Sequence, residues 1–162
     1  MLPGSMRLPE LFPVEDVLLH FAPADKWDAI RKLVDHLVKR GRLPASSQSA
    51  IVEAVLARER STSTGMEHGI AIPHAAVEGV ERVVACLGVV DGETGLEFQS
   101  CDGRPARFVV LLVIPRAQKL LHIRTLADIA RVLLRDSVRS QLLAAHTPAE
   151  AWAALADEGS AK

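Results

Sequence analysis

Two long apolar runs constrain the fold of this 162-residue chain more than any other feature. Residues 83–90 and 107–114 are almost without polar side chains and are rich in Val and Leu. Apolar runs of this length, bounded by turn signals such as Asp102-Gly103, are typical of buried β-strands. Because neither run alternates between apolar and polar residues, both faces of the sheet are expected to be covered.

Helical periodicity and shorter apolar runs surround these two strands. Apolar residues at helical spacing predict five helices, at 25–41, from 46 or 47 to 59, after Pro115, at 136–145 and at 148–156. Two shorter strands are expected at 17–21 and 69–73, and Pro73 must end the second or place it at a sheet edge. The order of elements predicts a layered α/β or α+β domain.

Composition excludes several classes of protein. Hydrophobic residues make up 49% and charged residues 24% of the chain, values of a globular protein rather than a disordered one. The net charge is −1, without long runs of one sign, so we expect no nucleic-acid partner. The longest apolar run, 108–114, is far shorter than the roughly 20 residues of a membrane-spanning helix, so no direct membrane insertion is expected.

The chain start carries no export signal, since residues 1–6 lack both a basic segment and an apolar core. We therefore expect residues 1–6 to be a leader outside the fold, 7–157 a single domain and 158–162 a tail, in the cytoplasm. Cys86 and Cys101 lack the spacing of a metal site, and both are expected to be buried or half-buried thiols.

Position separates one histidine from the other five. His74 follows a strand-ending proline and a Ser/Thr-rich turn at 61–65, which places its imidazole at the rim of the sheet, where site residues gather. That position alone is also compatible with an ordinary surface histidine. His36 lies between core positions of its helix and is expected to be solvated. His20 and His146 suggest no function.

Residues 57–74 carry a longer signature, which reads Ala-Arg-Glu-Arg-Ser-Thr-Ser-Thr-Gly-Met-Glu-His-Gly-Ile-Ala-Ile-Pro-His. This segment resembles the signature of the mannitol/fructose/nitrogen-regulatory enzyme IIA family of the bacterial phosphotransferase system. Further matches follow in the same order, at Gly95-Leu-Glu-Phe98, Asp102-Gly103, 108–115 and His122. The resemblance covers essentially the whole chain after the leader.

The resemblance implies a small mixed β-sheet flanked by helices on both sides, and a phosphoryl carrier that needs no cofactor and no metal. His74 would accept the phosphoryl group on Nε2 from the phosphohistidine of the carrier protein HPr, or of its nitrogen-branch counterpart. A IIB protein or regulatory target proteins would be the acceptors. The resemblance also carries over Arg58 and His122 as site residues. His68 is a departure, because the family most often has a small polar residue there.

General chemistry gives each of these residues a task. An imidazole with an ordinary pKa of about 6.5 is largely neutral at pH 7 and can attack phosphorus directly, provided its other nitrogen donates to an oxygen. Arg58 would hold the phosphoryl oxygens, and His122 would donate to one of them. The turn Ser63-Thr64-Gly65 would bind phosphate through hydroxyl and N–H donors, or would simply be a satisfied turn. The alternative for Arg58, which the motif disfavours, is a helix C-terminal cation that complements the helix dipole.

Other expectations concern partners and rival functions. We expect Met66 and Leu121 to form an apolar contact patch, and Glu59 to bind backbone or Arg58 rather than face the phosphate. One rival is a zinc hydrolase built on His68, His74 and His122; another is a binding module that has lost phosphoryl transfer. The chain ends about where the family domain ends, with no attached IIB or IIC part, which favours the stand-alone nitrogen-regulatory branch or a separate sugar subunit.

Overall fold

The computed structural model describes residues 11, 13–92 and 95–157, without the side chains of Lys119, Leu121, His122 and Asp157. Within the described residues the chain forms five α-helices: α2 (Lys26–Lys39), α3 (Gln48–Ser61), α4 (Lys119–Leu133), α5 (Asp136–Ala144) and α6 (Pro148–Asp157). The strands are β1 (Val17–Phe21), β2 (Ile70–Ala71), β3 (His74–Val77), β4 (Val84–Val90) and β5 (Phe108–Pro115). Three short 3₁₀ helices complete the set: η1 (Val14–Asp16), η2 (Ala45–Ser47) and η3 (Glu67–Gly69).

The five strands form one mixed sheet, with β5 near its centre. β5 pairs antiparallel with β4 and parallel with both β2 and β3, while β1 adds parallel to β4. β2 and β3 keep the same register on β5, because Ile70 faces Phe108 and His74 faces Leu112 (108 − 70 = 112 − 74 = 38). They are therefore one edge strand that is interrupted at Ile72 and Pro73.

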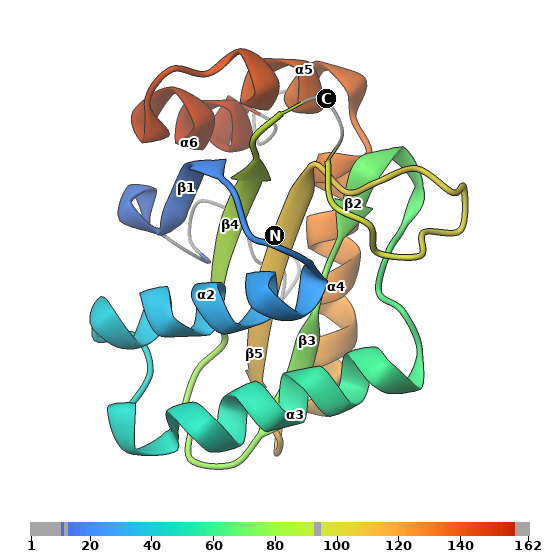
Figure 1. Ribbon diagram of the computed structural model, residues 1–162. Coiled ribbons are helices and arrows are strands. Elements are labelled where there is room, and N and C mark those ends of the chain that lie inside the picture. Colours follow the sequence, from blue (N-terminus) through green and yellow to red (C-terminus); the bar gives the residue numbers. More distant parts are fainter. Residues whose placement is uncertain (1–10, 12, 93–94, 158–162) are drawn as a thin grey trace.

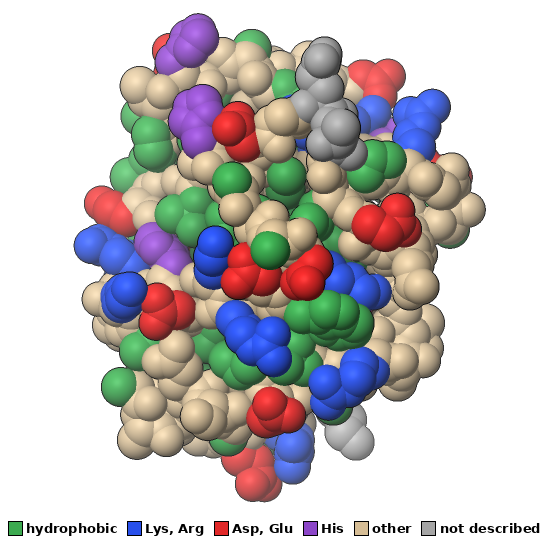
Figure 2. Space-filling view, viewed as in Figure 1, with side chains coloured by type: hydrophobic (Ala, Val, Ile, Leu, Met, Phe, Trp, Pro, Cys, Tyr) green, Lys and Arg blue, Asp and Glu red, His purple; other side chains and the backbone are tan. Residues whose placement is uncertain are grey.

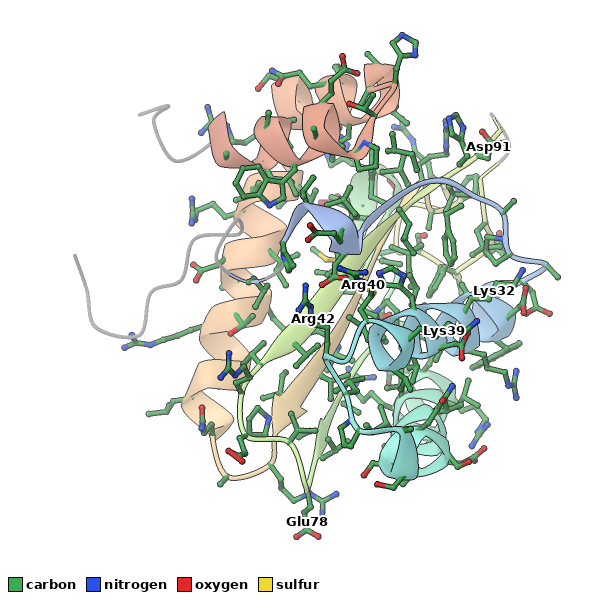
Figure 3. All side chains as sticks on the ribbon, turned by 90° about the vertical axis from the view of Figure 1, so that its left-hand side faces the viewer. Lys32, Lys39, Arg40, Arg42, Glu78 and Asp91 are labelled. Carbon is green, nitrogen blue, oxygen red and sulfur yellow. The ribbon has the colours of Figure 1, made fainter. Side chains whose placement is uncertain are left out.

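Helices cover both faces of this sheet, as Figures 1 and 3 show. One face, which includes Leu87 and Leu112, packs on α4, α5 and α6. The opposite face, which includes Cys86 and Leu111, packs on α2 and α3. Consecutive residues of β4 and β5 thus belong to different apolar clusters, which explains why both strands are apolar throughout.

The helix α2 begins where its sequence predicts. The Asp25 side chain accepts a hydrogen bond from the Asp28 backbone N–H at 2.8 Å, a standard N-terminal cap. On the surface, Lys32 pairs with Asp28 and Lys39 with Asp35, each four residues apart. Figure 2 shows basic and acidic side chains interspersed over the α2–α3 face.

The predicted fold class is confirmed, and the five helices and four predicted strands lie within a few residues of their expected bounds. Two side-chain predictions are wrong. Cys86 is buried as expected, but Cys101 is exposed, because it lies in a hydrogen-bonded turn closed from Gly103 to Ser100. His36 is not simply solvated, since its Nε2 lies 2.9 Å from an oxygen of the buried Asp16.

The limits of the chain stay a prediction, because the leader 1–6 and the tail 158–162 lie outside the described residues. Within the part of the chain that the structure describes, none of the helices combines the length and the apolar character needed to span a bilayer.

Candidate functional site

The edge strand that β2 and β3 form, interrupted at Ile72 and Pro73, provides the backbone of the site. Pro73 has no N–H to donate to β5, so the ladder cannot run through it. The Ile72 N–H turns away from β5 and donates to the Thr64 carbonyl at 3.3 Å, while the Pro73 carbonyl accepts from the Leu112 N–H at 3.0 Å. Backbone groups alternate in direction along an edge strand, so the carbonyls of Gly69 and Pro73 bond to β5 and the Ile72 carbonyl points to the open side. His74 is the first residue of β3.

The imidazole of His74 uses that carbonyl. Its Nδ1 lies 2.8 Å from the Ile72 oxygen, and since a carbonyl can only accept, Nδ1 carries the proton. In the neutral ring this places the lone pair on Nε2. Only 6% of the surface of His74 is exposed, less than its predicted position at the rim suggested. The ring is therefore held in one tautomer with limited access to water.

The turn before β2 is built from its own polar side chains. The Ser63 hydroxyl donates to the Phe98 carbonyl, and its oxygen accepts the Gly65 N–H at 3.1 Å. A Cβ at Gly65 would lie 2.9 Å from the Phe98 oxygen, so a side chain there would clash with backbone. These bonds assign the donors of Ser63 and Gly65 to the loop itself, and phosphate binding by Ser63, Thr64 and Gly65 stays a prediction.

Glu59 anchors the same turn from inside the protein. Its carboxylate is 2% exposed and accepts from the Thr64 hydroxyl at 2.6 Å and the Thr64 N–H at 3.0 Å. The ammonium of Lys26, which is 7% exposed, lies 3.1 Å from Glu59 Oε2. The expectation that Glu59 binds backbone rather than faces a phosphate agrees with this geometry.

Arg58 lies in the last turn of α3, one residue before this anchor. Its Nη1 donates to the Thr62 carbonyl at 2.9 Å, and its own carbonyl accepts the Ser61 hydroxyl at 2.8 Å. The guanidinium carries five N–H groups, of which this contact uses one. The structure therefore places Arg58 on the same helix–turn junction as Thr64.

His122 lies in the first turn of α4, near the positive end of the helix dipole. Its side chain lies outside the described part of the structure, so its role stays a prediction. Among the described side chains, which leave out that of His122, no three His, Cys, Asp or Glu residues gather so as to hold a metal ion.

His68 occupies a strained position next to the turn. Its φ is +64°, in the left-handed region, and its N–H donates at 3.0 Å to Asp102 Oδ2. The other oxygen of Asp102 accepts the Arg104 N–H at 3.0 Å. The His68 N–H, followed by that of Arg104, lowers the pKa of Asp102 below its ordinary value of 3.8. This carboxylate thus ties the loop at 99–104 to the signature segment.

Acid is expected to weaken the hydrogen bonds that the Asp102 carboxylate accepts from His68 and Arg104. Because the pKa of Asp102 is lowered by folding, its contribution to stability is present above pH 3.8 and is lost as the pH falls through the lower, folded value. The amide proton shift of His68, followed by NMR, should titrate below pH 3.8 and should not titrate in that range in Asp102→Asn. A midpoint at or above 3.8 would contradict this prediction.

The ion pair of Lys26 and Glu59 was not predicted from the sequence, although helical periodicity places both residues on buried helix faces. Lys26 precedes the core residue Ile30 by four positions, and Glu59 follows the core residue Val55 by four. Residues four apart share a helix face, so both charges lie on buried faces of neighbouring helices. The Ile72 carbonyl was also missed, and no sequence signal identifies a backbone acceptor.

Comparisons with known proteins identify relatives along most of the chain. A family model described as "Phosphoenolpyruvate-dependent sugar phosphotransferase system, EIIA 2" matches residues 10–158. A fructose-specific EIIA component from Haloferax volcanii is 32% identical over 83% of this chain and 85% of its own length. A nitrogen regulatory protein from Bradyrhizobium diazoefficiens is 28% identical over 93% of this chain and 95% of its own length. This chain spans only 22% of the fructose-specific EIIABC component of Bacillus subtilis, to which it is 32% identical.

Solved structures share the fold. Nitrogen regulatory protein IIA-Ntr from Neisseria meningitidis superposes with a TM-score of 0.79, at 24% identity over 91% of this chain and 98% of that one. The mannitol enzyme IIA of Escherichia coli, solved in complex with phosphorylated mannitol enzyme IIB, gives a TM-score of 0.73 at 26% identity. That match covers 90% of this chain and 97% of the mannitol protein.

Proposed function

Because this chain belongs to the EIIA 2 family of the phosphoenolpyruvate-dependent sugar phosphotransferase system, we propose that His74 is its phosphoryl-accepting residue. The donor is phosphorylated HPr or its nitrogen-branch counterpart, in the cytoplasm. The observation that carries the proposal is the hydrogen bond from Nδ1 of His74 to the Ile72 carbonyl, which leaves the lone pair on Nε2. Nε2 is the nucleophilic atom.

The transfer step needs no separate base. The Nε2 lone pair forms a bond to phosphorus while the phosphorus–nitrogen bond of the donor's phosphohistidine breaks. The electron pair of the broken bond stays on the donor's ring nitrogen, and Nδ1 of His74 keeps its proton on the Ile72 carbonyl. No group is oxidised or reduced. The protein's contribution is positioning and neutralisation of the charge on the phosphoryl oxygens.

Arg58 and His122 supply that neutralisation in the proposed mechanism. Arg58 provides a permanently charged fork from the end of α3, on the junction that also holds Thr64. His122 donates to a phosphoryl oxygen from the first turn of α4, where backbone N–H groups and the helix dipole also favour an anion. For the turn at Ser63, Thr64 and Gly65 to bind phosphate as well, its donors would have to exchange the hydrogen bonds that they make within the protein.

The donor docks on the start of α4 in this proposal. Leu120 and Ile123 are 76% and 67% exposed, and they lie within one helical turn of His122. Met66, proposed from the sequence for this patch, is half-buried and packs in part against the core. The side chain of Leu121, the other proposed member, lies outside the described residues. Exposed apolar side chains beside a site are typical of contact surfaces for partners.

The double substitution Leu120→Asp and Ile123→Asp should weaken docking rather than chemistry. We expect the donor concentration that gives half the maximal phosphorylation rate to rise by about tenfold, with little change in the maximal rate. Leu143→Asp is the matched control, because Leu143 is also exposed but lies on α5. Equal effects of the two variants, measured by stopped reactions at graded donor concentrations, would rule this surface out.

Within the family, we place this chain in the nitrogen-regulatory branch, where the phosphorylated state of His74 acts as a signal to target proteins. A nitrogen regulatory relative that is matched over 95% of its own length supports this placement. The alternative is a sugar-specific subunit that passes the group to a IIB protein, as the fructose-specific relative suggests. Both readings use the same phosphohistidine.

One incubation tests the proposal. The protein is mixed with phosphoenolpyruvate, enzyme I and HPr, or with the two nitrogen-branch counterparts, and is analysed by intact mass. We expect one acid-labile phosphoryl group per chain, formed faster with the nitrogen-branch pair. No adduct with either pair, or an acid-stable one, would overturn the proposed function, while faster labelling by HPr would favour the sugar-specific alternative.

A further inference from the structure

We infer that the buried ion pair of Lys26 and Glu59 is a positioning device, which holds the Ile72 carbonyl where it fixes the tautomer and orientation of the His74 ring. This inference rests on the proposed function of His74 as phosphoryl acceptor. It assigns a task to two charged residues that do not belong to the reacting groups. Lys26 and Glu59 come from two different helices, α2 and α3.

A continuous chain of hydrogen bonds leads from the ion pair to the ring. Lys26 Nζ lies 3.1 Å from Glu59 Oε2, and the Glu59 carboxylate holds Thr64 by its N–H and by its hydroxyl. The Thr64 carbonyl accepts the Ile72 N–H at 3.3 Å. The Ile72 carbonyl accepts from His74 Nδ1 at 2.8 Å. Each link fixes the backbone of the next residue, so a shift of Thr64 is passed to the His74 acceptor.

A second branch starts from the same ammonium group. Lys26 Nζ lies 5.5 Å from the centre of the Phe98 ring and 4.9 Å from that of Trp27. The Phe98 carbonyl accepts the Ser63 hydroxyl, one residue before Thr64. Lys26 therefore contacts both segments that hold the turn, the end of α3 and the loop that contains Phe98.

Burial makes this arrangement rigid. Lys26, Glu59 and Thr64 are each at least nine-tenths buried, at 7%, 2% and 9% exposure. A buried carboxylate must keep every partner that it has, because water cannot replace one that moves away. Glu59 accepts three hydrogen bonds here, two of them from Thr64. Thr64 is thus confined more tightly than a turn residue held by backbone bonds alone.

The consequence for phosphoryl transfer follows from the tautomer. If the Ile72 carbonyl moves, Nδ1 loses its acceptor and the proton is free to occupy Nε2 instead. A ring protonated on Nε2 has no lone pair at the attacking atom, and a displaced ring is misaligned for in-line attack. Loss of the ion pair should therefore lower the maximal transfer rate while leaving the affinity for the donor protein unchanged.

Two variants and one control test the inference. Glu59→Gln removes the negative charge and one hydrogen-bond acceptor while keeping the side-chain shape. Thr64→Val removes only the hydroxyl group that donates to Glu59, and it provides the test if Glu59→Gln does not fold. The control is Asp16→Asn, since Asp16 is 1% exposed and binds His36 and Arg42 at 2.9 Å each. His36 follows Lys26 by ten residues along α2, about 15 Å. Figure 3 shows Arg42 beyond the C-terminal end of that helix.

The readouts are the ¹⁵N chemical shifts of the His74 ring without donor, the transfer rate at saturating donor, and the melting temperature. We expect both test variants to show increased protonation of Nε2, and at least a tenfold lower maximal rate for Glu59→Gln, with unchanged half-saturation. Asp16→Asn should lower the melting temperature but leave ring shifts and rate as in the wild type.

Wild-type ring shifts and rate in Glu59→Gln, or in Thr64→Val if the first variant does not fold, would overturn the inference. An equal loss in Asp16→Asn would overturn it as well, since the effect would then be one of stability alone. Failure of the wild-type protein itself to accept a phosphoryl group would contradict the proposed function instead. The ring shifts are measured without donor and so separate the two failures.

Discussion

His74→Gln is expected to accept no measurable phosphoryl group from either donor. Glutamine has nearly the length of histidine and can donate its amide N–H to the Ile72 carbonyl, so the loop is retained. Its amide nitrogen has no lone pair available to attack phosphorus. Intact mass after incubation with phosphoenolpyruvate, enzyme I and HPr measures the loss, and a melting curve shows whether the fold is kept.

The matched control for this variant is His20→Gln. His20 lies in β1 rather than β3 and is exposed, and its Nδ1 lies 3.3 Å from Oδ1 of Asp91, which is also exposed. It should be phosphorylated at the wild-type rate. Phosphorylation of His74→Gln to the wild-type level, or no phosphorylation of His20→Gln, would mean that a residue other than His74 is the acceptor.

Arg58→Gln is expected to lower the phosphorylation rate by about 100-fold at saturating donor, because removal of one preorganised charge donor typically costs this much. Glutamine can still donate an N–H to the Thr62 carbonyl, so the end of α3 should persist. Arg58→Lys should recover only part of the rate, because an ammonium cannot form the planar fork of a guanidinium. The effect is measured by single-turnover kinetics, in which the Arg58 variant is limiting and the phosphorylated donor is in excess.

Arg60→Gln serves as the control for Arg58. Arg60 is an exposed cation two residues further along the same last turn, so it carries the same charge on the same helix end. A general electrostatic attraction of the donor would make the two variants equal. If the phosphorylation rate of Arg58→Gln is within about twofold of that of Arg60→Gln, the difference is smaller than any loss expected from removal of a specific charge donor. Arg58 then takes no specific part in the transfer.

Most of the fold could be predicted from sequence because it is dictated by burial. β4 and β5 are buried throughout, and their unbroken apolar runs already indicated a sheet covered on both faces. β3 could not be predicted, since His-Ala-Ala-Val has weak strand propensity and Pro73 suggested an end. The strand exists because residues after the proline resume the register of β2 on β5.

Part of the candidate site could likewise be predicted from the sequence, and part could not. The position of His74 at a strand boundary follows from Pro73, and its proposed role rests on the signature at 57–74. Its tautomer did not follow, because the acceptor is a backbone carbonyl, which no residue type in the sequence identifies. The contact between His36 and Asp16 was likewise hidden, because it joins residues 20 positions apart through tertiary packing.

The most direct test of the central claim is an NMR spectrum of the ¹⁵N-labelled protein after phosphorylation, which shows the nitrogen that is bonded to phosphorus. The account predicts a scalar coupling between phosphorus and Nε2 of His74, with Nδ1 still protonated and hydrogen-bonded to Ile72. Coupling to Nδ1 of His74, or to a nitrogen of any other residue, would contradict it.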